Sequence, residues 1–298
     1  MKNKKPTIGL GILSWKSHET ITKTLNSYKK KKFKSLFDEA IIYFSDISKE
    51  DKKLAKKFGY KAVGSKNLGI AVGTENLAKA LKTDYILIAQ NDNPFVENLT
   101  FAKKHLEEAV KLLENKKADL VRMRHRWQVG EGFCDVEKYL KFFPAKSVDK
   151  NFIPSENHVK KENYSDSFRK KLLRFFRPFK AQSLKGRGVF IEKTPHKLFP
   201  EVIKKEGDFF IIDSSVINFS DQCFLVSRDF FLNVLMKFVN ENPNKRTLNN
   251  FQVPEICLNS KWWKQQHFKI AQGQGLLTHN RFDGSFRKGH HAYKGKKQ

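Results

Sequence analysis

Long apolar runs are missing from this 298-residue sequence, and no window reaches the roughly 18 to 20 apolar residues that a membrane-spanning helix requires. The first residues, Met-Lys-Asn-Lys-Lys-Pro, lead into a strand-like segment rather than into the apolar region of a signal peptide. Cysteine is also scarce: Cys134, Cys223 and Cys257 are too far apart for a zinc knuckle and odd in number for a disulfide framework. We therefore expect a cytoplasmic protein whose thiols are reduced.

Acidic residues are few, 31 against 58 basic ones, which gives a formal net charge of +27 at pH 7. A charge of this size is typical of proteins that bind nucleic acids or anionic membranes. However, only 11 of the basic residues are arginine, and the lysines are spread over the whole chain, whereas phosphate and base recognition favours clustered arginine. Zinc, RNP and helix-turn-helix signatures are missing as well. The composition therefore favours a solvated, solubility-conferring surface and leaves nucleic-acid binding as an alternative.

Hydrophobic residues make up 39% of the sequence, which is enough for one large α/β domain or two small ones. In the first ninety residues, strand-length apolar runs alternate with amphipathic stretches. The apolar runs predict strands at residues 7–13, 40–44, 61–64 and 85–89. The amphipathic stretches predict helices at residues 17–28, 48–59 and 71–81, with Ser17 and Ser48 as N-caps. This βαβ rhythm predicts an α/β fold with a mostly parallel central sheet and helices on both faces.

The remainder of the chain is less regular. A helix is predicted at residues 102–113 and a strand at 119–124, after which residues 125 to about 188 are aromatic, basic and rich in loop-forming residues. Further strands are predicted at residues 208–212, 216–219, 223–226 and 268–271. Further helices are predicted at residues 229–240 and, after Pro254, over a segment that carries Trp262 and Trp263. Tryptophans such as these either pack in the core or stack on a ligand.

Residues 167–180 combine an apolar helical face with a basic surround. The apolar positions are Phe168, Leu172, Phe175, Phe176 and Phe179. The basic positions are Arg169, Lys170, Lys171, Arg174, Arg177 and Lys180. This pattern is typical of a helix that lies on an anionic membrane surface. A helix that packs on its own domain has the same periodicity, so peripheral membrane association and internal packing both stay open.

The segment Tyr-Ile-Leu-Ile-Ala-Gln-Asn-Asp-Asn-Pro-Phe at residues 85–95 is a buried strand that ends in a single carboxylate, Asp92, between Asn91 and Asn93. In parallel α/β sheets, ligands bind at the carboxyl ends of the strands, and a carboxylate there suits a hard divalent cation. An Asx turn that caps the next helix uses the same residue types equally well. On its own, this segment leaves both interpretations open.

Four motifs, in order, resemble the nucleotide-sugar-binding half of GT-A fold glycosyltransferases, in particular the glycosyltransferase family 2 type. The first strand ends in Ile-Leu-Ser-Trp and the second in Ser-Asp. Lys-Asn-Leu-Gly-Ile-Ala-Val-Gly-Thr-Glu-Asn follows at residues 66–76, and the next strand ends in Gln-Asn-Asp-Asn. The resemblance implies that a nucleoside diphosphate sugar is bound by Ser14, Trp15, Asp46, Lys66, Asn67, Gly69, Asn76 and Asn91.

The resemblance also implies a metal site. The family has an Asp-x-Asp type motif at the strand end that here carries Asp92, and many GT-A enzymes have a histidine near the C-terminus that contacts the metal or the diphosphate. Asp92 and His279 are therefore the expected metal ligands, and Arg281 is an expected phosphate contact. The chain departs from the family pattern because Asn91 replaces a second carboxylate, so the metal would depend largely on the substrate phosphates. An oxygen and imidazole ligand set suits Mn²⁺ at least as well as Mg²⁺.

In inverting members of the family, a carboxylate deprotonates the acceptor hydroxyl. Glu255 is the expected base, because it follows Pro254 at a helix start and stands 24 residues before His279, a separation similar to that in the family. A favourable charge at a helix N-terminus is the other interpretation of Glu255. Asp221 and Asp213, each at the edge of a strand-like segment, are reserve catalytic candidates, and Asp221 could instead contact the acceptor.

The resemblance implies a single GT-A domain over residues 1–298. Residues 1–124 would bind the nucleotide sugar, residues 125–283 would build the acceptor site and contain the long basic insertion at about 125–188, and residues 284–298 would form a flexible basic tail. The implied function is that of a metal-dependent, inverting glycosyltransferase of glycan biosynthesis, with a glycan, lipid or protein acceptor. Two alternatives stay open: a nucleic-acid-binding protein, and a catalytically inactive GT-A-like binding scaffold with a reduced metal motif.

Overall fold

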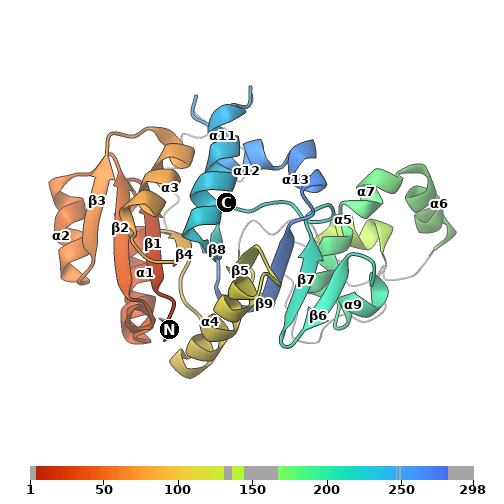
Figure 1. Cartoon of the computed structure of the whole chain (residues 1–298), viewed down its shortest axis with the longest axis horizontal. Helices are drawn as coiled ribbons and strands as arrows, with labels where there is room; N and C mark the ends of the chain where they lie inside the picture. Colours follow the sequence, from red (N-terminus) through yellow and green to blue (C-terminus); the bar gives the residue numbers. More distant parts are fainter. Residues whose placement is uncertain (1–4, 131–135, 144–166, 246, 248–249, 281–298) are drawn as a thin grey trace, which may run out of the picture.

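The computed structural model describes residues 5–130, 136–143, 167–245, 247 and 250–280. Within them, one nine-stranded sheet has the order β3-β2-β1-β4-β8-β5-β9-β7-β6 (Figure 1). The strands are β1 (Ile8–Ser14), β2 (Glu39–Ser45), β3 (Lys61–Ser65), β4 (Tyr85–Gln90), β5 (Leu120–Arg124), β6 (Ile203–Glu206), β7 (Phe209–Asp213), β8 (Cys223–Ser227) and β9 (Lys269–Leu277). The α/β fold class predicted from the sequence is therefore confirmed.

Most of the strands run in one direction. The pairs β1–β2, β1–β4, β2–β3 and β5–β9 are parallel. β8 lies between β4 and β5 and is antiparallel to both, and β7 is antiparallel to β9. β8 comes from the second half of the chain, whereas its neighbours β4 and β5 come from the first half. The two halves of the chain therefore share one continuous sheet.

Helices cover both faces of the sheet. They are α1 (His18–Lys30), α2 (Lys49–Lys57), α3 (Gly69–Ala80), α4 (Leu99–Glu114), α5 (Val136–Phe142), α6 (Phe168–Phe176), α7 (Pro178–Gln182), α8 (Gly188–Ile191), α9 (Pro195–Leu198), α10 (Arg228–Phe230), α11 (Lys237–Glu241), α12 (Pro254–Leu258) and α13 (Lys261–Gln265), with the 3₁₀ helices η1 (Phe33–Leu36) and η2 (Lys185–Arg187) and the π-helical η3 (Phe231–Met236). The predicted helix at residues 229–240 is thus a continuous run of α10, η3 and α11.

Two hydrophobic cores lie on opposite faces of the sheet. One packs α1, α2 and α4 against the sheet, and the other packs α3, η3, α12 and α13. Successive strand residues divide between them, since Ile42 belongs to the first core and Ile41 to the second. A strand that is apolar on both faces reads as an unbroken hydrophobic run, which is why the central strands could be recognised in the sequence.

The predicted strand at residues 216–219 is wrong. This segment is a loop in which the Asn259 side chain satisfies the backbone of Phe219: Oδ1 accepts from the Phe219 N–H at 2.7 Å, and Nδ2 donates to the Phe219 carbonyl at 3.0 Å. The Ile217 carbonyl accepts a hydrogen bond from Trp263 Nε1 at 2.8 Å. Because side chains supply these hydrogen bonds, the buried apolar segment needs no neighbouring strand.

Other boundaries also differ from the predictions. The helix predicted over residues 167–180 is two helices, α6 and α7, that meet at Arg177, where the ring of Pro178 starts the second helix. The segment after Pro254 is likewise divided into α12 and α13. Ser48 caps α2 through its side chain as predicted, whereas the side chain of Ser17 makes no capping hydrogen bond to α1. Part of the insertion at residues 125–188, and the whole of the tail at 284–298, lie outside the described residues.

Candidate active site

The carboxyl ends of the parallel strands lie at one edge of the sheet, which we call the C-terminal edge. The strands β1, β2, β3 and β4 reach it at Ser14, Ser45, Ser65 and Gln90. β8 runs the other way, so Asp221, just before its first residue, comes to the same edge. β9 is parallel to β5, so His279, just after its last residue, reaches this edge as well. Residues far apart in the sequence therefore meet here.

Asp92 and His279 form a buried pair at the C-terminal edge. The Asp92 Oδ2 atom lies 3.1 Å from Nε2 of His279, and each residue is 1% exposed. The turn after β4 is closed by Asn93, whose Oδ1 accepts from the backbone N–H of Gln90 at 2.7 Å. The Asx turn that would cap the next helix is not formed here: the Asn93 contact runs back to Gln90, and α4 is capped by Asn98, whose Oδ1 accepts from the backbone N–H of Phe101 at 2.8 Å. The Asp92 carboxylate meets the imidazole instead.

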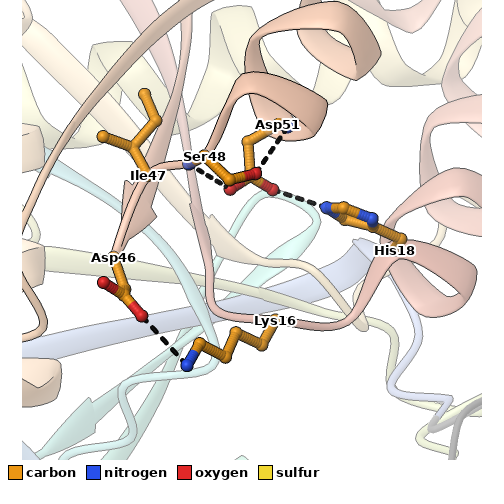
Figure 2. Close-up of a pocket in the computed structure, with 6 residues that line it drawn as sticks. All are labelled: Lys16, His18, Asp46, Ile47, Ser48 and Asp51. Carbon is orange, nitrogen blue, oxygen red and sulfur yellow. Dashed lines mark hydrogen bonds and ion pairs between the residues drawn. The ribbon is translucent and has the colours of Figure 1, made fainter.

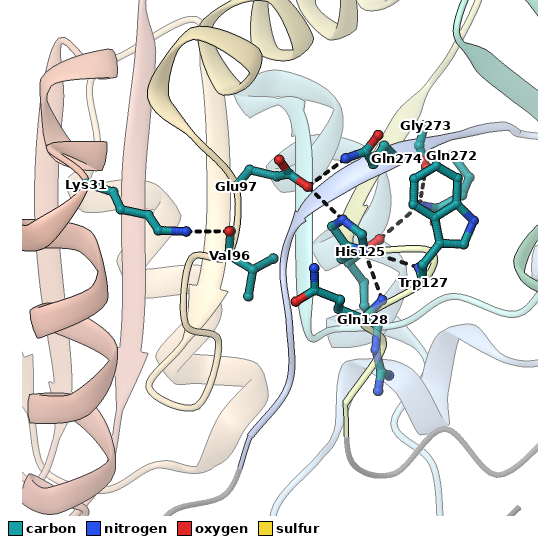
Figure 3. A network of polar contacts seen from close by, with 10 residues as sticks. Lys31, Val96, Glu97, His125, Trp127, Gln128, Gln272, Gly273 and Gln274 are labelled. Atoms are coloured by element: carbon teal, nitrogen blue, oxygen red, sulfur yellow. Dashed lines mark hydrogen bonds and ion pairs between the residues drawn. The ribbon is translucent and has the colours of Figure 1, made fainter. Parts of the chain in front are cut away.

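A polar network around His125 supports the segment that carries His279 (Figure 3). The Nδ1 atom of His125 accepts from the backbone N–H groups of Trp127 at 3.1 Å and Gln128 at 2.9 Å, so the ring proton is on Nε2, which donates to Oε1 of Glu97 at 2.8 Å. The Gln274 side chain donates to the same oxygen at 2.6 Å. Burial lowers the pKa of His125 and Glu97 opposes that shift. Neither His125 nor Glu97 was predicted from the sequence to be functional.

The turn fixed by this network packs on the histidine through Gly130. Gly130 has φ +70°, and a Cβ atom there would overlap the carbonyl oxygen of His279 and the Thr278 hydroxyl. Only glycine therefore allows this close approach without strain. Because Gly130 contacts the backbone of His279, a shift of the turn held by the His125 network would also move His279.

Asp221 and Glu255 form a second acidic pair at the edge. Asp221 is buried before β8, where its carbonyl accepts from Gln90 Nε2 at 3.2 Å, and Glu255 lies in the first turn of α12 after Pro254. Burial raises the pKa of Asp221 far above its usual range, and the charge of Glu255, the charge of Asp92 and a side-chain hydrogen bond with Glu255 raise it further. These effects favour the protonated form of Asp221 beside Glu255.

Buried arginines offset these negative charges. Burial lowers the pKa of Arg122 to about 9 and that of Arg124 to about 10, so both stay charged at neutral pH, and the charge of Glu255 acts on both. Together with Arg187 they line a small cavity of about 30 Å³ that reaches Cys223. These arginines were not predicted from the sequence to be functional, although the Leu-Val-Arg-Met-Arg pattern of β5 places two charges on one face of a buried strand.

A larger pocket opens where β1 and β2 end (Figure 2). Its volume is about 440 Å³, and its lining residues are Lys16, His18, Asp46, Ile47, Ser48 and Asp51. Nζ of Lys16 lies 3.0 Å from Oδ2 of Asp46, and Nε2 of His18 lies 2.6 Å from Oδ1 of Asp51. Lys16 and Asp46 both have positive φ, at 40° and 72°, so each strand end turns sharply into this pocket. Of the predicted donor-binding residues, Asp46 lines it directly.

The other predicted donor-binding residues are distributed around this edge. Ser14 is buried at the end of β1, and its Oγ has no hydrogen-bond partner in the described part of the chain, whereas Trp15 is half-buried. The backbone N–H of Asn91 donates to the Leu13 carbonyl at 3.0 Å. Lys66 is exposed beyond β3. Arg281 lies outside the described residues.

Residues of the Asn-Leu-Gly segment also have structural contacts. Oδ1 of Asn67 accepts from the backbone N–H of Gly69 at 3.0 Å. Gly69 has φ +86° and packs against Phe251, where a Cβ atom would overlap the ring. Asn76, within α3, donates from Nδ2 to the Tyr43 hydroxyl at 3.2 Å. These contacts shape the loop between β3 and α3 and the start of that helix.

One expectation needs correction. Asp213, a reserve catalytic candidate, pairs with Lys269 at the start of β9, so it lies at the opposite edge of the sheet from Asp92. Of the two interpretations of the later tryptophans, the structure shows packing: Trp263 is a core residue, and Trp262 stacks on Phe238 with ring centroids 3.9 Å apart.

The described residues contain no group of three or more His, Cys, Asp or Glu side chains placed to hold a metal ion. Asp92 and His279 alone fit a pair of adjacent ligands. Two donors on an octahedral ion, each about 2.1 Å from it, are about 3.0 Å apart, and the observed separation is 3.1 Å. The residues present therefore fit a divalent ion that takes its remaining ligands from a bound diphosphate and from water.

No family model and no curated protein matches this sequence. Among solved structures, the chain is similar to TarS 1–349 of S. aureus, with 12% identity and a TM-score of 0.47 over 92% of this chain and 60% of that one. It is also similar to the same TarS fragment in complex with UDP-GlcNAc (11%, TM-score 0.44, 93% and 59% of the two chains). A third is the mannosyltransferase PcManGT of Pyrobaculum calidifontis in complex with GDP-Man and Mn²⁺ (12%, TM-score 0.34, 41% and 36%).

The chain spans about three fifths of the TarS 1–349 chains that it matches and a smaller share of PcManGT. All of these TM-scores are below 0.5.

Proposed function

We propose that this chain is a metal-dependent, inverting glycosyltransferase that moves a sugar from a nucleoside diphosphate sugar to an acceptor hydroxyl. The observation that carries the proposal is the meeting of two pairs at one sheet edge, Asp92 with His279 and Asp221 with Glu255. The charge of Asp92 acts on the pKa of Asp221, so the pairs share one electrostatic neighbourhood. A site for a phosphate-bound cation beside a carboxylate pair that holds one proton is what such a transfer requires.

The donor would lie along the C-terminal edge. The pocket of about 440 Å³ at the ends of β1 and β2 has room for a base and ribose, and Asp46 at its wall suits a hydroxyl or an N–H donor. Ser14 offers a buried hydroxyl between this pocket and Asp92. We further propose, from the family resemblance, that Trp15, Lys66, Asn67, Gly69, Asn76, Asn91 and Arg281 contribute to donor binding. From this pocket the diphosphate would extend toward Asp92.

Asp92 and His279 would hold the metal. A divalent ion there would neutralise the diphosphate leaving group without a proton transfer. The imidazole would bind the ion in its neutral form. Mn²⁺ or Mg²⁺ suits the carboxylate, and the imidazole favours Mn²⁺.

Glu255 is the proposed catalytic base and Asp221 its positioning partner. The protonated Asp221 donates a hydrogen bond to the Glu255 carboxylate and leaves the other Glu255 oxygen for the acceptor hydroxyl. Glu255 takes the hydroxyl proton as the acceptor oxygen bonds to the anomeric carbon, and the bond from that carbon to the diphosphate oxygen breaks with its electron pair leaving on the phosphate. Attack from the face opposite the leaving group inverts the configuration.

The proposal is tested by donor turnover in the full chain. We expect slow hydrolysis of UDP-GlcNAc or GDP-mannose that requires Mn²⁺, and a Mn²⁺-dependent rise in melting temperature with the same donor. Asp92→Ala should abolish both effects, whereas Asp208→Asn, at an exposed position, should leave both unchanged. If a panel of nucleotide sugars gives binding but no turnover with any acceptor, the chain is a GT-A-like binding scaffold. If neither binding nor turnover occurs, the proposal is wrong.

A further inference from the structure

Large exposed apolar side chains are concentrated on α6 and α7. Apart from Leu68, every exposed large apolar side chain in the described residues lies there: Phe168, Leu172, Phe175, Phe176 and Phe179, with exposed fractions of 79, 43, 77, 68 and 90%. We call these five residues and the basic residues among them the α6–α7 surface. Exposure of this extent over two short helices is far beyond the scattered apolar residues of an ordinary protein surface.

The α6–α7 surface is exposed because the helices pack through other residues. Leu173 is half-buried against a small cluster of Phe142, Ala181 and Leu184, which anchors α6 and α7 to α5. No residue of α6 is buried. Internal packing, the alternative considered from the sequence, therefore accounts for Leu173 and not for the phenylalanines.

The charge of the surface identifies its partner. Between Ser167 and Lys180 there are six basic residues and no acidic one: Arg169, Lys170, Lys171, Arg174, Arg177 and Lys180. A protein interface core excludes charge, whereas a bilayer interface accepts aromatic rings at the depth of the headgroups and attracts lysine and arginine to anionic lipids. Basic and aromatic side chains alternate along α6 and α7, and this mixture suits a lipid surface.

We propose that the α6–α7 surface docks this protein on an anionic lipid bilayer. In Figure 1, α6 lies at one end of the molecule, beyond the edge strand β6 and its neighbour β7. The phenylalanines enter the headgroup region, and the basic side chains meet lipid phosphates and carboxylates. Docking is independent of the proposed transfer reaction, because α6 and α7 contribute nothing to the pair Asp92–His279 or to Asp221–Glu255.

The test is co-sedimentation of the full chain with vesicles. We expect binding to vesicles of phosphatidylcholine mixed with phosphatidylserine, weak binding to phosphatidylcholine alone, and loss of binding as salt is raised. Phe175→Ser combined with Phe176→Ser should weaken binding at least about tenfold, and the melting temperature should stay unchanged because both rings are exposed.

The role of the basic residues is tested by replacing two lysines on α6 and, as the control, two lysines on α2. Lys170→Glu combined with Lys171→Glu should weaken binding to the anionic vesicles, whereas Lys52→Glu combined with Lys53→Glu, the same change on α2, should have little effect. Equal losses for the two lysine pairs would show that only the total charge matters and would overturn the proposal. So would unchanged binding of the phenylalanine variant, or no binding of the wild-type chain to any vesicle.

Discussion

The carboxylate of Asp92 and the imidazole of His279 lie 3.1 Å apart although 187 residues separate them in the sequence. Each belongs to the segment that follows a strand end, and the backbone N–H of Asn280 donates to the Asp92 carbonyl at 2.9 Å, which holds the two segments together. Both side chains are buried, so the two groups already lie side by side in the folded chain. Such an arrangement suits a metal site.

The pair makes a first prediction about metal binding. His279→Gln should weaken the apparent affinity for Mn²⁺ in the presence of a nucleoside diphosphate at least about tenfold, since one of the two proposed protein ligands is lost. Calorimetric titration of Mn²⁺ into the chain with UDP or GDP measures this. The control is His267→Gln, because the side chain of His267 is 67% exposed. Wild-type affinity in the His279 variant would exclude it as a ligand.

A second prediction separates the roles of Asp221 and Glu255. Glu255→Gln should lower kcat by about 10²- to 10⁴-fold because the proposed base is lost. Asp221→Asn should keep kcat within about tenfold of the wild type, since an amide N–H replaces the hydrogen bond that protonated Asp221 donates. Asp221→Ala should lose more activity than Asp221→Asn. Should Asp221→Asn instead cost as much as Glu255→Gln, Asp221 would be the base.

A third prediction concerns Gly130, which packs on the backbone of His279. Alanine at Gly207 is the matched control, because Gly207 also has positive φ, at 57°, but a Cβ atom there meets nothing within 4 Å. Gly207→Ala should cost about 1 kcal/mol from backbone strain alone. Gly130→Ala should cost more, and it should weaken Mn²⁺ binding because the His279 segment must shift. Urea unfolding and metal titration of both variants test this, and equal effects would contradict it.

A fourth prediction concerns pH. His105 is 2% exposed between the rings of Phe101 and Phe209, and burial lowers its pKa to about 4 from an ordinary value of 6.5. Between pH 6.5 and 4 the unfolded chain therefore binds a proton that the folded chain does not, so stability falls as pH falls through this window. The loss between pH 7 and pH 5 should be about 2 kcal/mol from this residue.

The variant His105→Leu isolates that contribution. Its free energy of unfolding should be lower at pH 7, since the stacking is lost, but should decline less on acidification to pH 5 than that of the wild type. His267→Gln, at an exposed histidine, should decline as the wild type does. Parallel declines of the wild type and His105→Leu would show that His105 does not titrate differently in the two states.

The ends of the strands could be predicted from the sequence, because a local pattern of apolar and polar residues determines where a strand stops. The apolar run of β4 is buried on both faces and stops at a polar turn, so Asp92 could be placed at a sheet edge without the structure. The same holds for Asp46 after β2. The residues that surround them from the second half of the chain were named mainly through the family resemblance.

The network around His125 was not accessible in this way. Its partners Glu97 and Gln274 meet because β9 pairs with β5 through a bulge, where Gly275 with φ +84° shifts the register. Long-range register is set by packing of whole strands, which no local pattern encodes. Arg122 and Arg124 were missed for a related reason: their burial depends on the acidic pairs that tertiary structure brings beside them.

By itself, the sequence determined the alternation of strands and helices, the α/β class and the polar turn that carries Asp92, because hydrophobic periodicity and turn chemistry act over a few residues. Only the tertiary structure decided which way β8 runs. Its antiparallel insertion between β4 and β5 brings Asp221 to the edge where Asp92 and His279 lie. The antiparallel pairing of β7 with β9 leaves Asp213 at the opposite edge. The tertiary structure also decided that the phenylalanines of α6 and α7 face outward, since burial depends on what packs against a helix and not on its own periodicity.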